Sequence, residues 1–180
     1  NDIICVSGDL GRSYLGLQIL EREKSVFFSN PEMQPELSNY KDLIEKQLKP
    51  KARKDLIEKF AEINIIPNSM IDISDGLASD LIHLSIQSKL GVKIYEEKLP
   101  ILKSTILTAN ELNLNPTTCA LNGGEDYELL FSVNEKDYNT LRDNGIDVTS
   151  IGYFTSNEKC TLVSKEGEII SLKAQGWKHF

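Results

Sequence analysis

The fold around the polar residues is best predicted from one segment, Met70-Ile71-Asp72-Ile73-Ser74-Asp75-Gly76-Leu77. Residues 70–73 read as a short buried strand, and residues 76–90 have the apolar spacing of an amphipathic helix. Because side chains two apart on a strand point to the same face, Asp72 and Ser74 are predicted to project together where the strand ends. Asp75 then falls at the turn into the helix, where Gly76 permits a close backbone approach.

Two interpretations of this strand-to-helix segment stay open. Two carboxylates and a hydroxyl beside a helix N-terminus make an oxygen-rich pocket, and Mg²⁺ takes such oxygens together with water and substrate phosphates. The helix N-terminus also favours phosphate oxygens. Equally, Ser74 or Asp75 could do no more than cap the helix, and the spacing by itself slightly favours that interpretation.

A second polar segment, Asn122-Gly123-Gly124-Glu125-Asp126-Tyr127-Glu128, runs into an apolar strand predicted at residues 127–133. Paired glycines allow a backbone to approach a ligand closely, and two acids follow them here. A plain turn with solvated acids explains the same residues, and local chemistry favours it. The loop at residues 8–11, Gly-Asp-Leu-Gly, matches no phosphate-binding pattern, so we interpret it as a strand-to-helix turn.

Strands and helices alternate along the chain, which predicts one α/β (α+β) domain with a mixed β-sheet and helices packed on it. We expect strands at residues 3–6, 70–73, 92–95, 127–133 and 148–154, and helices at residues 12–24, 36–48, 50–63, 76–90, 104–112 and 135–144. The helix at residues 50–63 is predicted to have Pro50 in its first turn. Gly91 is predicted to cap the C-terminus of the helix at residues 76–90. Residues 160–164 and 168–172 are predicted to form a hairpin.

The composition excludes several classes of function. A formal net charge of −7 argues against a generic nucleic-acid binder, because phosphate backbones are held mainly by lysine and arginine. No apolar run is long enough for a membrane span, and the first residues do not resemble a signal peptide. Cys5, Cys119 and Cys160 lie far apart, which supports neither a zinc site nor a disulfide framework and favours the cytoplasm. Neither His83 nor His179 has a Ser or Cys partner, so no catalytic nucleophile is expected.

Together and in this order, the motifs resemble those of thiamine-monophosphate kinases. Residues 70–77 resemble the family's Asp-x-Ser-Asp-Gly-Leu signature, and residues 122–131 its Gly-Gly-Glu-Asp-Tyr-Glu-Leu motif almost residue for residue. Residues 6–17, 49–53 and 176–180 are similar to three further family segments, although Asp9 and Arg12 stand where the family usually has Thr and Asp. The resemblance implies the fold of the C-terminal domain of aminoimidazole ribonucleotide synthetase.

The resemblance also implies roles for five residues. Asp72 and Asp75 would be magnesium ligands, and Ser74 would contact the phosphates of ATP. Glu125 would contact thiamine monophosphate, and Trp177 would lie against its ring system. The implied reaction transfers the ATP γ-phosphoryl group directly to thiamine monophosphate, giving thiamine diphosphate, with Mg²⁺ as the cofactor and no protein nucleophile.

The resemblance covers only the second domain of the family. Residues 1–180 are expected to be that C-terminal domain with the strand leading into it, and the N-terminal ATP- and magnesium-binding domain is expected to be missing. We therefore expect a chain that folds but does not catalyse alone, and a homodimer is left open. Two alternatives remain: another ATP-dependent synthetase of the same superfamily, and a non-catalytic binding module that keeps the fold.

Overall fold

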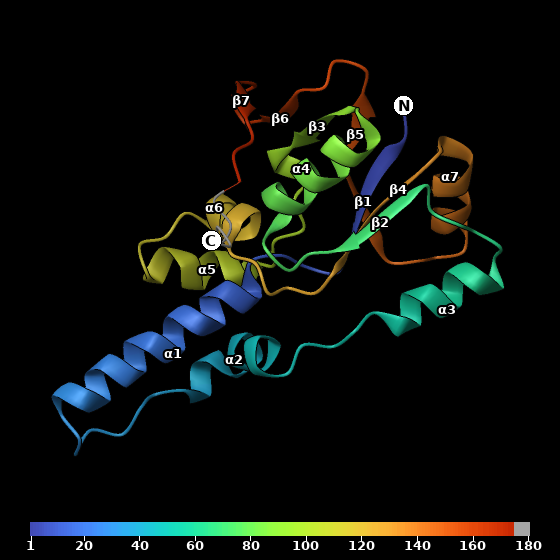
Figure 1. Ribbon diagram of the computed structural model, residues 1–180. Helices are drawn as coiled ribbons and strands as arrows, with labels where there is room; N and C mark the ends of the chain where they lie inside the picture. The colour runs from blue at the N-terminus through green and yellow to red at the C-terminus, as the bar shows by residue number, and fades with distance from the viewer. Residues whose placement is uncertain (175–180) are drawn as a thin grey trace.

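The computed structural model describes residues 1–174, and a mixed seven-stranded sheet forms its centre (Figure 1). The strands are β1 (Ile3–Ser7), β2 (Ser69–Asp72), β3 (Gly91–Tyr95), β4 (Leu129–Val133), β5 (Val148–Thr155), β6 (Cys160–Val163) and β7 (Ile169–Ser171). Their order across the sheet is β2-β4-β1-β5-β3-β6-β7. Among the strands described, β3 and β6 form the one parallel pair, so the predicted mixed sheet is confirmed.

The helices cover both faces of this sheet and extend beyond it (Figure 1). They are α1 (Arg12–Ser29), α2 (Lys41–Leu48), α3 (Lys54–Glu62), α4 (Leu77–Ser88), α5 (Lys103–Glu111), α6 (Pro116–Asn122) and α7 (Glu135–Asp143), with short 3₁₀ turns η1 (Ser38–Tyr40) and η2 (Glu96–Lys98). In the part of the chain that the structure describes, none of them has the length and apolarity needed to cross a membrane.

Alternation of side chains along the strands builds a separate core on each face of the sheet. In β1, Ile4 and Val6 belong to a core that includes Leu77 and Leu81 of α4. Cys5, between them, points to the other face and packs in a core with residues of α3 and α7. The period of two in a strand therefore determines which helices each face can bury.

The α1 and α2 helices pack against each other and project away from the sheet (Figure 1). Leu15 of α1 and Leu43 of α2 are both buried in a third core, together with residues of α5 and α6. Gly16 makes this close contact feasible, because a Cβ there would lie 2.2 Å from the carbonyl oxygen of Leu43. A larger residue at Gly16 would force the two helices apart.

The segments that carry the polar motifs meet at one edge of the sheet. β1 and β2 both pair antiparallel with β4, so they run in the same direction and end beside the start of β4. Asp72 lies opposite Leu129, and Val6 lies opposite Leu130. Residues 8–11 follow β1, residues 73–76 follow β2 and residues 122–128 precede β4, so the topology brings these three segments together.

Two predicted helix ends are wrong. Pro50 does not lie in the first turn of a helix, because α3 begins at Lys54 and the proline falls in the connection after α2. Gly91 does not cap α4, because it is already the first residue of β3. The C-cap of α4 is Lys89, which adopts a left-handed conformation with φ of 56°.

Apolar periodicity does not predict α6, although the start of this helix carries two standard signals. Pro116 occupies the first turn, and the side chain of Asn115 accepts a 2.9 Å hydrogen bond from the backbone N–H of Thr118. A helix of seven residues is too short to show apolar periodicity clearly, which is why it escapes a pattern search. The predicted hairpin of β6 and β7 is confirmed.

Candidate functional site

The segment after β2 forms a turn that presents its side chains without capping α4. β2 ends at Asp72, so Ser74 lies in the turn and the predicted strand alternation of these two residues does not apply. Gly76 is the N-cap residue of α4, with φ of 117°, and no side chain caps the helix there. The capping interpretation of Ser74 and Asp75 is therefore wrong.

Backbone hydrogen bonds join this turn to the segment that precedes β4. The N–H of Tyr127 donates to the carbonyl oxygen of Ile73 at 2.9 Å, and the N–H of Ile73 donates to the carbonyl oxygen of Glu128 at 2.8 Å. The N–H of Glu125 donates to the carbonyl oxygen of Ser74, also at 2.8 Å. Two motifs far apart in the sequence thus form one continuous hydrogen-bonded unit.

Two glycines allow the backbones of this unit to approach so closely. A Cβ on Gly124 would lie 2.6 Å from the carbonyl oxygen of Ser74, and its φ is 68°. A Cβ on Gly76 would lie 2.9 Å from the carbonyl oxygen of Leu121, at the end of α6. Both positions need a residue without a side chain, for space and for a φ that other residues rarely adopt.

Glu125 is the exposed acid of the second motif. Its φ of 59° and that of Tyr127, 50°, place both residues in the left-handed region. The hydroxyl of Tyr127 donates a 3.0 Å hydrogen bond to the Glu125 carboxylate. This bond, followed by burial and by the charges of Glu125, Asp72 and Asp75, raises the pKa of the Tyr127 phenol. The Tyr127 phenol is therefore influenced by the acids of both motifs.

The acids at the start of α4 form a second concentration of negative charge. Asp72 is exposed and Asp75 half-buried, and neither forms a salt bridge within residues 1–174. Asp80, in the first turn of α4, is 2% exposed, and its Oδ2 has no hydrogen-bond partner among the described residues. Burial, and then the charges of Asp75 and Asp72, raise the pKa of Asp80 to about 6.

This arrangement fits a divalent cation. Mg²⁺ takes hard oxygen ligands, often one or two carboxylates, and completes its shell with water and phosphate. Asp72 and Asp75 would contribute two such carboxylates, and a cation beside them would relieve the repulsion that acts on Asp80. Within residues 1–174 no group of three or more His, Cys, Asp or Glu side chains is arranged to hold a metal ion. The pair alone would thus leave most of the shell to water or substrate.

Asp126, beside Glu125, has a structural role that the sequence pattern does not reveal. It is fully buried, and its carboxylate accepts hydrogen bonds from the backbone N–H groups of Gly11 at 2.8 Å and Ser13 at 3.3 Å. These are free donors at the N-terminus of α1, so Asp126 caps that helix from a distant part of the chain. Burial raises the pKa of Asp126 to about 7, although the two hydrogen bonds act in the opposite direction. The solvated-turn interpretation is wrong for this residue.

Glu128 is likewise buried and holds three partners. Its carboxylate forms ion pairs with Lys46 at 2.6 Å and Arg53 at 2.8 Å, and accepts a 2.7 Å hydrogen bond from the Ser7 hydroxyl. A Cβ on Gly8 would lie 2.5 Å from the same carboxyl group. Glu128 therefore links α2 and the connection that follows it to the end of β1.

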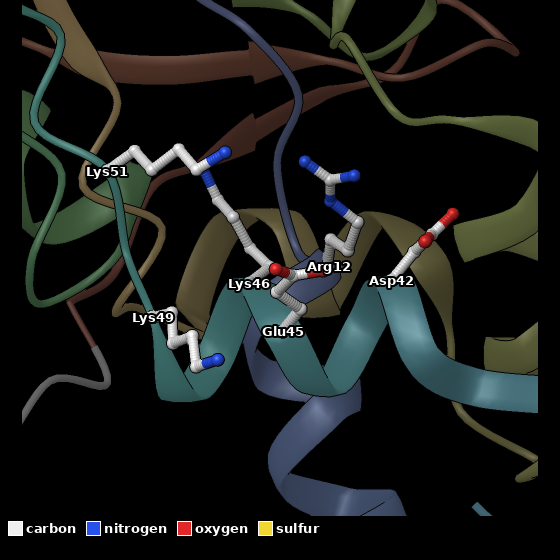
Figure 2. Close-up of a pocket in the computed structure, with 6 residues that line it drawn as sticks. All are labelled: Arg12, Asp42, Glu45, Lys46, Lys49 and Lys51. Atoms are coloured by element: carbon white, nitrogen blue, oxygen red, sulfur yellow. The ribbon is translucent and has the colours of Figure 1, made fainter. Parts of the chain in front are cut away.

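A cavity lined entirely by charged residues lies beside this ion-pair network (Figure 2). Its lining residues are Arg12, Asp42, Glu45, Lys46, Lys49 and Lys51. Arg12 pairs with Asp9 at 3.0 Å, and Lys46 shares the Glu128 carboxylate with Arg53. The lining also contains Lys49 and Lys51 and the acids Asp42 and Glu45, so its cations outnumber its acids.

Trp177, the residue predicted to contact the ring system, lies outside the described residues. The other predicted site residues are brought to one edge of the sheet: Asp72, Ser74 and Asp75 follow β2, and Glu125 precedes β4. Their ligand contacts stay predictions. No sequence pattern distinguishes Gly8, Asp126 and Glu128 from ordinary loop residues, although all three help to position this edge of the sheet.

Comparison with curated proteins finds relatives over nearly the whole chain. The chain is 40% identical over 184 residues to the thiamine-monophosphate kinase of Buchnera aphidicola subsp. Schizaphis graminum, covering 99% of this chain and 53% of the relative. It is 36% identical to that of Aquifex aeolicus, covering 99% and 52%. The chain spans about half the length of the curated relatives it matches. No protein-family model matches it.

Comparison with solved structures finds the same kind of protein. A structure described as AaThiL complexed with AMPPCP and TMP has a TM-score of 0.80 and 32% identity, covering all of this chain and 52% of that one. The thiamine monophosphate kinase of Aquifex aeolicus has a TM-score of 0.74 and 30% identity, covering 94% and 51%. Hydrogenase maturation protein HypE, at 16% identity and a TM-score of 0.70 over 100% of this chain and 55% of that one, shares the fold.

Proposed function

Because this chain is similar over nearly its whole length to thiamine-monophosphate kinases, we propose that it supplies the C-terminal half of such an enzyme. The enzyme would transfer the γ-phosphoryl group of ATP to thiamine monophosphate. The observation that carries the proposal is the hydrogen-bonded junction of residues 73–76 with residues 122–128. Phosphoryl transfer requires nucleotide, metal and acceptor to be held together, and this junction fixes the acids of both motifs in one unit.

The chain's own residues would divide the binding work. Asp72 and Asp75 would hold Mg²⁺, which would neutralise phosphate charge when bound. Ser74, in the turn between them, would contact the phosphates of ATP. Glu125, whose backbone is anchored to Ser74, would contact thiamine monophosphate, and Trp177 would lie against its ring system.

Two further observations support this assignment. The neighbouring structure named AaThiL was obtained with AMPPCP and TMP, a triphosphate analogue and a monophosphate, as the proposal requires. Asp72, Asp75 and Glu125 form no salt bridge with a described lysine or arginine, so their charges remain free for ligands. Cys5, Cys119 and Cys160 are free thiols, which agrees with a cytoplasmic setting.

The proposal is tested by measuring formation of thiamine diphosphate from ATP, Mg²⁺ and thiamine monophosphate. The chain alone should give no product, because its relatives are about twice as long. The chain joined to the other half of the enzyme should give product at a rate typical of kinases, and Asp75→Asn should abolish it. Phosphorylation of some other acceptor, with none of thiamine monophosphate, would favour another synthetase. No reaction with any acceptor would favour a binding module.

A further inference from the structure

Asp80 is a buried acid with an oxygen atom that no described residue satisfies. The residue lies in the first turn of α4 and is only 2% exposed. Its Oδ2 forms no hydrogen bond within residues 1–174. Buried carboxylates are normally paired or hydrogen-bonded, because an unpaired charge is costly to remove from water. The fold of the described residues therefore does not by itself explain an acid at this position.

The two other acids that are buried in the described part of the chain are both satisfied. Asp126 accepts hydrogen bonds from two backbone N–H groups at the start of α1. Glu128 forms ion pairs with Lys46 and Arg53. Of these three acids, only Asp80 has a buried oxygen without a partner in residues 1–174. This difference points to a partner that is not part of the described chain.

The unpartnered carboxylate lies close to the two proposed metal ligands. The backbone N–H of Asp80 donates a 3.1 Å hydrogen bond to the carbonyl oxygen of Gly76, which directly follows Asp75. Burial, and then the charges of Asp75 and Asp72, raise the pKa of Asp80, so both acids are within electrostatic reach of it. One buried and two accessible carboxylates thus concentrate negative charge at this turn.

Asp80 does not complete a set of three direct ligands. No group of three or more His, Cys, Asp or Glu side chains within residues 1–174 is arranged to hold a metal ion. Mg²⁺ usually keeps several of its water molecules when it binds to a protein. Groups that hydrogen-bond to the direct ligands also tune a metal site. A buried acceptor beside Asp72 and Asp75 can therefore act on a cation through water.

A role at the start of the helix is the simpler alternative, because acidic side chains near a helix N-terminus are stabilising. Asp137, in the first turn of α7, has the environment expected for that role. It is half-buried, and its carboxylate accepts a 2.8 Å hydrogen bond from the side chain of Asn134. Interaction with the helix start does not require burial or an unpartnered oxygen, so it does not account for Asp80.

We propose that Asp80 is a positioning residue of the cation site, whose carboxylate accepts hydrogen bonds from the hydration shell of a divalent cation held by Asp72 and Asp75. The inference rests on the proposed function for the assignment of those two ligands. A cation would supply the positive charge that the buried carboxylate lacks among the described residues. Asp80 should therefore raise the affinity of the site for the cation.

The first experiment measures binding of Mn²⁺ to the 180-residue chain by EPR, because the sharp signal of the free ion is lost on binding. Asp80→Asn should raise the Kd about tenfold or more, as loss of an outer hydrogen-bonding partner does at metal sites. Asp137→Asn, which changes the same residue type in the first turn of α7, is the matched control and should leave the Kd unchanged. Equal affinity in all three proteins, or no binding by the wild type, would overturn the inference.

The second experiment measures urea unfolding in EDTA, where the two roles predict opposite signs. Loss of a helix-start interaction should lower the urea midpoint, and Asp137→Asn should show this effect. Asp80→Asn should leave the midpoint unchanged or raise it, because it removes a buried charge that has no cation to balance it. A lower midpoint for Asp80→Asn would assign the residue to the start of α4 and overturn the inference.

A third measurement uses the wild-type chain and requires no variant to fold. In ¹³C NMR of the aspartate carboxyl carbons, Mg²⁺ should shift the resonance of Asp80 together with those of Asp72 and Asp75. The resonance of Asp137 should not move. A shift of the Asp72 and Asp75 resonances without one at Asp80 would overturn the inference.

The outcomes separate this inference from the proposed function. If the joined enzyme makes thiamine diphosphate while Asp80→Asn binds Mn²⁺ as tightly as the wild type, the role of Asp80 fails and the function stands. If the joined enzyme makes no product but Asp80→Asn weakens Mn²⁺ binding by the chain, the function fails and the role of Asp80 stands.

Discussion

The backbone N–H of Glu125 donates a 2.8 Å hydrogen bond to the carbonyl oxygen of Ser74. This bond ties the backbone of Glu125, the proposed contact to thiamine monophosphate, to the backbone of Ser74, the proposed contact to ATP. Gly124, between the two backbones, leaves no room for adjustment. A change on either segment should therefore disturb the acids on both.

Gly124→Ala should destabilise the protein more than the same substitution at a glycine that has a left-handed φ but no close contact. The new Cβ would lie 2.6 Å from the Ser74 carbonyl oxygen, in addition to the strain of a φ of 68°. Gly145→Ala is the matched control, because Gly145 has a φ of 65° and no atom within 4 Å of its Cβ position. The control should lose about 1 kcal/mol and Gly124→Ala at least about twice that, measured by urea unfolding. Equal losses would show that the close contact with Ser74 does not matter.

Glu128→Gln should lower stability strongly, because it leaves Lys46 and Arg53 without their shared carboxylate. The Glu128 side chain is only 6% exposed, and removing one partner of a buried ion pair typically costs about 3–5 kcal/mol. Amide hydrogen exchange should increase in residues 49–53, which the pairs hold in place. Glu21→Gln, which breaks an exposed pair with Lys24, should change stability by less than about 0.5 kcal/mol. Unchanged exchange in residues 49–53 would contradict this role of Glu128.

Asp72→Asn and Asp75→Asn should affect cation binding rather than folding. Both side chains are accessible and form no salt bridge within the described residues. The free energy of unfolding of each variant should therefore differ from that of the wild type by less than about 0.5 kcal/mol. Mg²⁺ should raise the melting temperature of the wild type, EDTA should reverse the rise, and each variant should show a smaller one. Asp143→Asn, at an exposed position on α7, should respond as the wild type does. A variant that unfolds readily but still responds to Mg²⁺ would assign that aspartate to the fold.

In metal-free buffer the protein should become less stable as the pH rises from about 4 to 7. Burial raises the pKa of Asp126 to about 7, whereas an aspartate in an unfolded chain titrates near about 3.9. Between these values the folded state retains a proton that the unfolded state has released, so the free energy of unfolding falls as pH rises.

Asp126→Asn should flatten this dependence and retain one acceptor for the N-terminus of α1. The check is the difference in urea midpoint between wild type and variant at several pH values. A difference that does not vary across the window would show that Asp126 is ionised throughout.

Trp177→Ala in the complete enzyme should raise KM for thiamine monophosphate and leave KM for ATP nearly unchanged. The reason is the proposed contact of the indole with the thiamine ring system, which ATP does not share. Steady-state kinetics with each substrate varied in turn measures the split. Parallel increases for both substrates, or loss of the fold, would assign Trp177 to packing.

The sequence by itself determined the local properties of this protein. Strand alternation and apolar helix spacing identified most elements, and the two acidic motifs marked Asp72, Asp75 and Glu125. These features depend on neighbours within a few residues, whose geometry is set by the backbone period. The sequence could not place Pro50 or Gly91 correctly, because helix ends depend on contacts made elsewhere.

Only the tertiary structure decided what the buried acids do. Asp126 and Glu128 stand beside Glu125 and share its charge, yet one caps α1 and the other pairs with Lys46 and Arg53. Their partners lie 75 to 115 residues away in the chain. A carboxylate in a loop is solvated by default, and only the antiparallel pairing of β1 and β2 with β4 brings enough donors to this edge to bury two.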